Sequence, residues 1–137
     1  SNIVQLLTSS CSIAVFWSEP IATDNCTLES FTSNKNSGDL FMLGTTSVTY
    51  TAVDSYGNSS TCSFNVTVID STVPIFSSCP TNLMLSANAS CEAIANWIPP
   101  IASDNCAISS TSATHAPGSI FPIGTTTVLY SATDATG

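Results

Sequence analysis

The chain of 137 residues carries one basic side chain, Lys35, against nine carboxylates, and its formal net charge is −8. Nucleic acids and anionic membrane surfaces are therefore poor partners, because proteins bind both through clustered lysine and arginine. No apolar run approaches the roughly 20 residues that a membrane-spanning helix needs, so membrane insertion is not expected. Serine (24) and threonine (19) fill 43 of the 137 positions, which predicts a surface covered by hydroxyl groups.

Six cysteines and four Asn-x-Ser/Thr sequons indicate a secretory, oxidising compartment. The cysteines lack the Cys-x-x-Cys spacing of zinc sites, so disulfides are the better interpretation. The cysteines are Cys11, Cys26, Cys62, Cys79, Cys91 and Cys106, and the sequons begin at Asn25, Asn58, Asn65 and Asn88. We therefore expect the chain to lie outside the cell or at its surface. Because the sequence shows no signal peptide, we expect it to be a mature chain or an interior segment.

The first elements of the chain occur twice. Residues 2–7 and 82–86 are each predicted to form a short strand, and a cysteine-led strand follows at 11–17 and at 91–97. Residues two apart share a face of a strand, so in both copies the cysteine and the final tryptophan point the same way. This placement favours two core tryptophans over exposed, sugar-stacking ones.

A polar Asp-Asn-Cys turn follows in both copies, opened by Asp24 and by Asp104. The segments after it, 27–37 and 107–117, differ most between the copies and are predicted to be exposed strand and loop. His115, the only histidine, lies in this divergent segment of one copy. Because nucleophilic catalysis needs a base held by partners, His115 gives no support for an enzyme.

The most similar stretch runs from residue 38 to 57 and again from 118 to 137. At an offset of 80, ten of its twenty residues are identical, which defines an internal repeat. In the first copy, Val48, Tyr50 and Ala52 alternate with hydroxyl side chains, the pattern of a strand with one buried face. A glycine before this strand and an Asp-x-x-Gly turn after it mark its ends.

The first copy continues into a closing strand at residues 62–70, in which apolar and polar side chains again alternate. Residues 71–73 are too few for a flexible linker, so the repeats should follow each other closely. We therefore predict two domains, residues 1–70 and 71–137. No segment shows helical periodicity.

The order of these motifs resembles the HYR domain, or hyalin repeat. The motifs that carry the resemblance are Pro-Ile-x-x-x-Cys-Pro, Cys-x-Ala-x-x-x-Trp, Ser-Asp-Asn-Cys, Pro-Gly-Ser-x-Phe-x-x-Gly-Thr-Thr-x-Val-x-Tyr and Cys-x-Phe-x-Val-x-Val. The resemblance covers essentially the whole chain. It implies an all-β fold of two tandem immunoglobulin-like β-sandwich repeats, without catalytic residues. Against the family pattern, the first repeat lacks its opening strand and the second lacks its closing strand.

The resemblance implies a structural or adhesive segment of an extracellular tandem-repeat array that forms a fibre or filament. Its expected partners are neighbouring repeats or identical subunits, joined head to tail, and its surface is expected to carry glycans. The alternative is a carbohydrate- or protein-binding module that uses the loops at one end of the sandwich. No cofactor is expected, and calcium is the one ion that such a module could use to assist binding. The candidate calcium ligands are Asp24, Asp54, Asp104 and Asp134. Each of them opens a turn, and this structural role explains an aspartate without a metal. The turn role also explains these residues better than a pair of catalytic carboxylates for glycoside hydrolysis does.

The disulfide connectivity stays open at this stage, although all six cysteines are expected to be oxidised. One scheme closes every bond within the sequence: Cys11–Cys26, Cys91–Cys106 and Cys62–Cys79. Schemes that reach across the ends of the sequence also remain open.

The four sequons differ in their predicted occupancy. Asn58 follows a glycine at a turn tip and is predicted to carry sugar, with Asn88 next for the same reason. Asn65 points outward from a strand and is a further candidate. Asn25 is the least favoured, because its sequon runs through Cys26.

Overall fold

A computed structural model describes residues 2–136 and shows strands but no helix in that range. None of the described segments could therefore cross a membrane as a long apolar helix. The chain divides into two compact units, Ser1–Ser71 (unit 1) and Thr72–Gly137 (unit 2). The predicted boundary falls between residues 70 and 71, next to this division. Gly137, which ends the second predicted Asp-x-x-Gly turn, lies outside the described residues.

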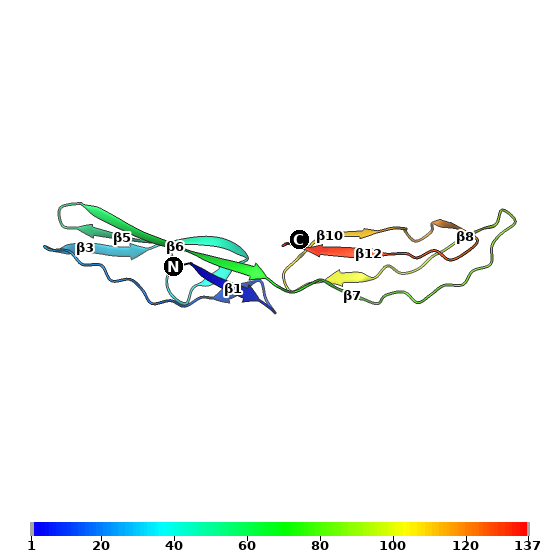
Figure 1. The fold of residues 1–137 in the computed structure, drawn as a ribbon, viewed down its shortest axis with the longest axis horizontal. Helices are drawn as coiled ribbons and strands as arrows, with labels where there is room; N and C mark the ends of the chain where they lie inside the picture. Colours follow the sequence, from blue (N-terminus) through cyan, green and yellow to red (C-terminus); the bar gives the residue numbers. More distant parts are fainter. Residues whose placement is uncertain (1, 137) are drawn as a thin grey trace. The chain divides into compact units, whose positions relative to one another are not determined.

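Unit 1 is built on a four-stranded sheet with the order β1-β6-β5-β3 (Figure 1). Its strands are β1 (Ile3–Leu7), β3 (Leu28–Ser33), β5 (Gly44–Asp54) and β6 (Ser59–Asp70). β5 and β6 form a long antiparallel hairpin, whereas β1 lies parallel to β6. A second, antiparallel ladder joins β2 (Ser12–Ala14) to β4 (Leu40–Met42).

The core of unit 1 draws side chains from both ladders. Its largest fully buried side chains are Phe41 of β4, Val48 of β5, Val66 and Val68 of β6, and Val15, which follows β2. Burial alternates along β5 and β6 as the period-2 pattern predicted. The predicted β-sandwich is thus confirmed: two ladders enclose one apolar layer.

Unit 2 repeats two ladders of unit 1. β8 (Glu92–Ile94) pairs with β11 (Ile120–Pro122), and β10 (Ile108–Ala113) pairs with β12 (Tyr130–Asp134). Each register equals that of unit 1 shifted by 80 residues, including the irregularity at Leu28/Ser30, which recurs at Ile108/Ser110. The tandem repeat predicted from the sequence is therefore confirmed down to individual strand pairs.

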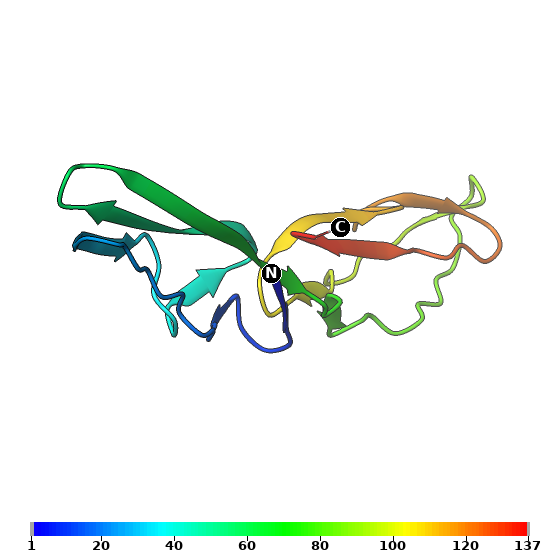
Figure 2. The same cartoon turned by 60° about the vertical axis from the view of Figure 1, so that its left-hand side comes forward.

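The second half of the unit 1 sheet has no counterpart in the described part of unit 2. In unit 1, β6 lies between β1 and β5 and pairs with both. The corresponding residues 83–87 and 124–129 of unit 2 form no strand, and Figure 2 shows the stretch between β7 and β8 as a thin tube. The prediction of a strand at residues 82–86 was therefore wrong. Of the strand predicted after residue 124, only β12 (Tyr130–Asp134) forms. A short strand needs a ladder partner, and these residues have none in the described range.

Unit 2 has an opening strand that unit 1 does not show. β7 (Ile75–Ser77) pairs antiparallel with β9 (Ile101–Ser103). The corresponding residues 21–23 of unit 1 form no strand. The two units thus share one plan and differ at the two strand positions that the family pattern singled out.

Candidate functional site

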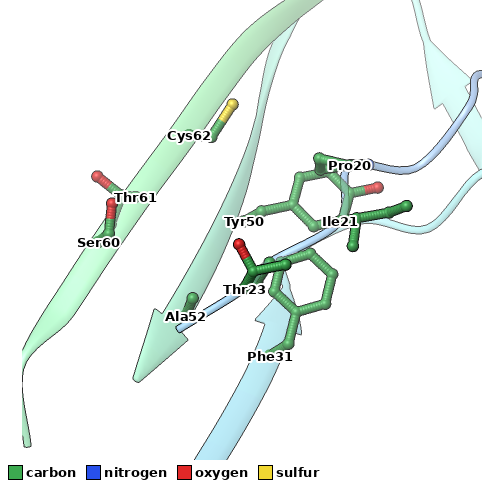
Figure 3. Close-up of a pocket in the computed structure, with 10 residues that line it drawn as sticks. Pro20, Ile21, Thr23, Phe31, Tyr50, Ala52, Ser60, Thr61 and Cys62 are labelled. Carbon is green, nitrogen blue, oxygen red and sulfur yellow. The ribbon is translucent and has the colours of Figure 1, made fainter. Parts of the chain in front are cut away.

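A cavity of about 280 Å³ lies in unit 1 beside the unpaired residues 21–23 (Figure 3). It is lined by residues 20–23, by Phe31 of β3, by Tyr50 and Ala52 of β5, and by residues 60–62 of β6. The rings of Phe31 and Tyr50 stack with their centroids 5.4 Å apart and their planes 16° from parallel. None of the lining side chains is charged.

This cavity was not predicted from the sequence. Its walls come from three strands and a proline-led loop that are far apart in the sequence, so no local pattern marks them. One signal was available, because Phe31 is a large apolar residue in the most divergent segment and Thr111 takes its place in the second copy.

The tryptophan of each unit is bonded to the tyrosine of the long repeated strand. Trp17 Nε1 donates to Tyr50 Oη at 2.7 Å, and Trp97 Nε1 donates to Tyr130 Oη at 2.6 Å. Trp17 also packs edge-on against Phe41, with the ring centroids 5.9 Å apart. Both indoles are half-buried, and their polar edges are satisfied internally. They are therefore core side chains, as predicted, and not exposed sugar platforms.

Each of the four candidate aspartates accepts a hydrogen bond from the backbone of its own turn. The acceptor is Oδ1 and the donor is the N–H two residues later, in the pairs Asp24–Cys26 (2.8 Å), Asp54–Tyr56 (2.8 Å), Asp104–Cys106 (3.0 Å) and Asp134–Thr136 (2.8 Å). Such side-chain turns are the usual reason for an aspartate at this place. Their predicted turn role is confirmed.

Asp54 accepts two further hydrogen bonds, both from Asn58. Asn58 donates its backbone N–H to Oδ1 at 2.9 Å and its Nδ2 to Oδ2 at 2.8 Å. The side-chain bond from Asn58 is the main reason that the pKa of Asp54 lies below its ordinary value, against a smaller opposing effect of desolvation. The backbone N–H groups of Asn58, Tyr56 and Gly57 lower this pKa further.

The aspartate-bearing turns of each unit lie together at one end of it. In unit 1, the Ser55 N–H donates to the Thr27 carbonyl oxygen at 3.1 Å and so joins the two turns. In unit 2, carboxylate oxygens of Asp104 and Asp134 lie within 4.8 Å of each other. Asp104 Oδ2 is buried and has no hydrogen-bond partner in the described part of the chain. Oxygen atoms grouped in this way are ligands that calcium accepts.

The cysteines are only partly oxidised in this structure. Cys11 is disulfide-bonded, and so is Cys106. The free, exposed thiols are those of Cys26, Cys62, Cys79 and Cys91. The scheme that closes every bond within the sequence is not formed here, since each of its three pairs includes at least one of these free thiols. Their oxidation in a secretory compartment stays a prediction.

All four sequon asparagines are exposed: Asn25, Asn58, Asn65 and Asn88. They differ in the use of the side-chain nitrogen to which a sugar would be attached. Nδ2 of Asn58 is bonded to Asp54. Asn88 uses its oxygen instead, as Oδ1 accepts the N–H groups of Ser90 at 2.8 Å and of Glu92 at 3.2 Å. The amide nitrogen of Asn88 is thus left for other partners.

His115 contacts a threonine hydroxyl and an aromatic ring. Its Nδ1 lies 3.3 Å from Thr114 Oγ1, and its ring packs on Phe121 with the centroids 5.0 Å apart. No carboxylate is among its hydrogen-bond partners in the described residues. The histidine therefore packs beside β11.

Two β-sandwich units with the same registers, turns and tryptophan–tyrosine bond define a tandem all-β repeat module. The chain belongs to the HYR domain family, which matches residues 1–68 and 69–137. It is 37% identical over 131 residues to hyalin of Strongylocentrotus purpuratus and 36% identical over 130 residues to hyalin of Lytechinus variegatus. These alignments cover 92% and 91% of this chain but only 11% and 24% of the two hyalins.

A second group of relatives has a different domain composition. The chain is 37% identical over 99 residues to the sushi, von Willebrand factor type A, EGF and pentraxin domain-containing protein 1 of Rattus norvegicus, which covers 72% of this chain and 3% of that protein. No solved structure matches the chain.

Proposed function

We propose that the chain is a non-catalytic, extracellular structural or adhesive segment of a tandem HYR array. The observation that supports this proposal best is the equivalence of the two units, whose strand registers and tryptophan–tyrosine bonds coincide at an offset of 80. An array uses interchangeable repeats, whereas a binding module needs a feature that only one repeat carries. The low coverage of the relatives also fits a module that is used within longer proteins.

The proposed partners are neighbouring repeats or identical subunits, joined head to tail into a fibre. Residues 83–85 support this, because Leu83, Met84 and Leu85 are 50%, 97% and 53% exposed on a segment without a ladder partner in the described chain. Unpaired backbone next to exposed apolar side chains favours the addition of a strand. A chain in which only 7% of the residues are charged offers little repulsion against such contacts.

Sedimentation velocity over a range of protein concentrations tests the assembly. We expect species larger than dimers that increase with concentration and elongated particles in electron micrographs. Leu85→Glu should weaken the assembly, since it places a charge on the unpaired segment, while Ser9→Glu adds the same charge in a turn of unit 1 as the control. A compact monomer at every concentration would contradict head-to-tail assembly.

We also propose that the surface carries N-linked sugar, with Asn88 occupied before Asn58. The predicted order was the reverse, but Nδ2 of Asn58 is held by Asp54. Glycopeptide analysis of chain secreted by eukaryotic cells should find sugar at Asn88, and Asn88→Gln should remove it. Secreted chain without sugar at either position would refute this part of the proposal.

Calcium-assisted ligand binding through the turn-bearing end is the second candidate function. Asp104 and Asp134 favour it, because their oxygens lie within 4.8 Å and one Asp104 oxygen is buried without a partner in the described residues. Calorimetric titration should show calcium binding at roughly 10⁻⁴ to 10⁻³ M, the range of extracellular modules. Asp104→Asn should abolish the heat and Asp24→Asn should leave it. Absence of binding at higher calcium would exclude this candidate.

A further inference from the structure

The outer face of the unit 1 sheet carries hydroxyl and apolar side chains next to each other. Residues two apart share a face of a strand, and Val48, Val66 and Val68 are buried on the inner face. The alternate residues of β1, β5 and β6 therefore point outward, and the strand registers place them in rows. The outer face consists of Val4, Leu6, Thr45, Ser47, Thr49, Ser63, Asn65, Thr67 and Ile69. None of these side chains is charged.

Asn65 lies in the middle of the outer face. It is exposed, lies opposite Ser47 of β5 and opens the sequon Asn65-Val66-Thr67. In the described part of the chain, no hydrogen bond to the Asn65 side chain is found, whereas Nδ2 of Asn58 is bonded to Asp54. The amide nitrogen of Asn65 is therefore available for the attachment of a sugar.

Apolar side chains lie at the β1 edge of the outer face, beside its hydroxyl groups. Val4 lies opposite Thr67, and Leu6 lies opposite Ile69. The side chains of Val4, Leu6 and Ile69 are 59%, 57% and 39% exposed. On the other side of β6, Thr67 Oγ1 lies 3.0 Å from Thr45 Oγ1. Neighbouring exposed apolar residues that are bordered by polar ones indicate contact with a further group.

The chemistry of a sugar ring fits this mixed surface. A pyranose has hydroxyl groups around its rim and C–H groups on its faces, so it can bond to serine and threonine while it covers aliphatic side chains. The spacing fits as well, because Thr67 lies about 7 Å along β6 from Asn65 and Val4 lies about 5 Å across the ladder from Thr67. The first sugars on Asn65 can therefore reach both kinds of side chain.

We propose that Asn65 carries an N-linked glycan whose first sugars dock on the outer face. In the modification, Asn65 Nδ2 forms a bond to the anomeric carbon of the first sugar and loses a proton. The bond from that carbon to the phosphate of a lipid-linked oligosaccharide donor breaks. The docked sugars bond to the hydroxyl groups beside Asn65 and cover the apolar edge, beginning at Val4. This inference rests on the proposed N-glycosylation and adds both a further site and the surface that holds its sugar.

Glycopeptide analysis and NMR of chain secreted by eukaryotic cells test the site and the surface in turn. Sugar should be found at Asn65, and Asn65→Gln should remove it. The glycosylated chain should then show nuclear Overhauser effects between sugar protons and the methyl groups of Val4. This measurement uses the unsubstituted chain, so it does not depend on the folding of a variant. Sugar at Asn65 without these effects would overturn the docking surface.

Endoglycosidase cleavage of the folded chain measures the same docking as a rate. If the glycan is docked for about nine-tenths of the time, it should be cleaved about tenfold more slowly than on an isolated peptide of residues 59–70, because the enzyme acts on the released fraction. Val4→Asp should raise the rate toward that of the peptide, since a charge resists being covered. Leu40→Asp adds the same charge at an exposed position of β4 and should leave the rate unchanged. Equal rates in the two variants would overturn the proposal.

The outcomes separate this inference from the proposed function. Sugar at Asn88 but none at Asn65 would overturn the new site and leave the proposed N-glycosylation intact. Sugar at Asn65 that is cleaved as fast as on the peptide would overturn the docking surface and leave the modification. Secreted chain without sugar at any sequon would refute both proposals together.

Discussion

The carboxylate of Asp54 stabilises the turn between β5 and β6 by accepting hydrogen bonds within it. Because its pKa is lowered in the folded state, the carboxylate form stabilises the fold at pH values above the unfolded pKa. That contribution is lost as the pH falls through the lowered folded-state pKa, below the ordinary value of 3.8. The stabilisation is therefore complete at neutral pH and disappears only in acid.

The Asn58→Ala substitution should raise the pKa of Asp54 toward its ordinary value, because the side-chain bond from Asn58 is the largest cause of the shift. An NMR titration of the Asp54 carboxyl carbon measures this directly. Tyr56→Ala is the matched control, since only the backbone N–H of Tyr56 reaches Asp54. An equal shift in both variants would refute the role assigned to the Asn58 side chain.

At the scale of the element, the long repeated strand is the same sequence motif in two environments. Val48 is fully buried in unit 1, where β5 pairs with β6 and β3. Its counterpart Val128 is only half-buried and lies in a segment without a ladder. The same residue type therefore contributes differently to the two units.

We expect Val48→Ala to destabilise unit 1 by about 2–3 kcal/mol, the usual cost of removing buried methyl groups and leaving a cavity. Val128→Ala, the matched substitution, should cost unit 2 less than about 1 kcal/mol, because little buried volume is lost. Urea unfolding followed by NMR signals of each unit separates the two effects. Equal costs would show that Val128 is packed as tightly as Val48.

The sequence predicted those elements whose signals are local. β5, β6 and the aspartate turns follow from alternation and turn chemistry within a few residues, and each formed as expected. The strand predicted at 82–86 did not form, because a strand also needs a partner that no local pattern supplies. The cavity was missed for a related reason, since the stacking of Phe31 on Tyr50 brings together residues from two separate strands.

At the scale of the whole molecule, the two units share one strand arrangement but differ in which strand positions are occupied. Unit 1 has the closing position occupied by β6 and the opening position vacant in the described residues, while unit 2 has β7 at the opening position. Each unit therefore displays the strand type that the other is without.

The parallel pairing of β1 with β6 has a consequence for a protein placed under tension. Five residue pairs, from Ile3↔Val66 to Leu7↔Asp70, join the first and last strands of unit 1. A force that draws Asn2 and Ser71 apart acts along both strands in opposite directions, so these pairs are loaded in shear and must yield together. Pulling Gly44 away from Ser71 instead opens the antiparallel β5–β6 ladder from one end, pair by pair, beginning at Gly44↔Val68.

Single-molecule pulling between residues 2 and 71 should therefore give a rupture force well above that measured between residues 44 and 71 of the same chain. Similar forces for both attachments would show that the parallel pairs do not bear the load. If the difference is found, unit 1 resists stretching along the chain while remaining easy to open from the side, and a series of such units would give an extensible matrix a defined yield point.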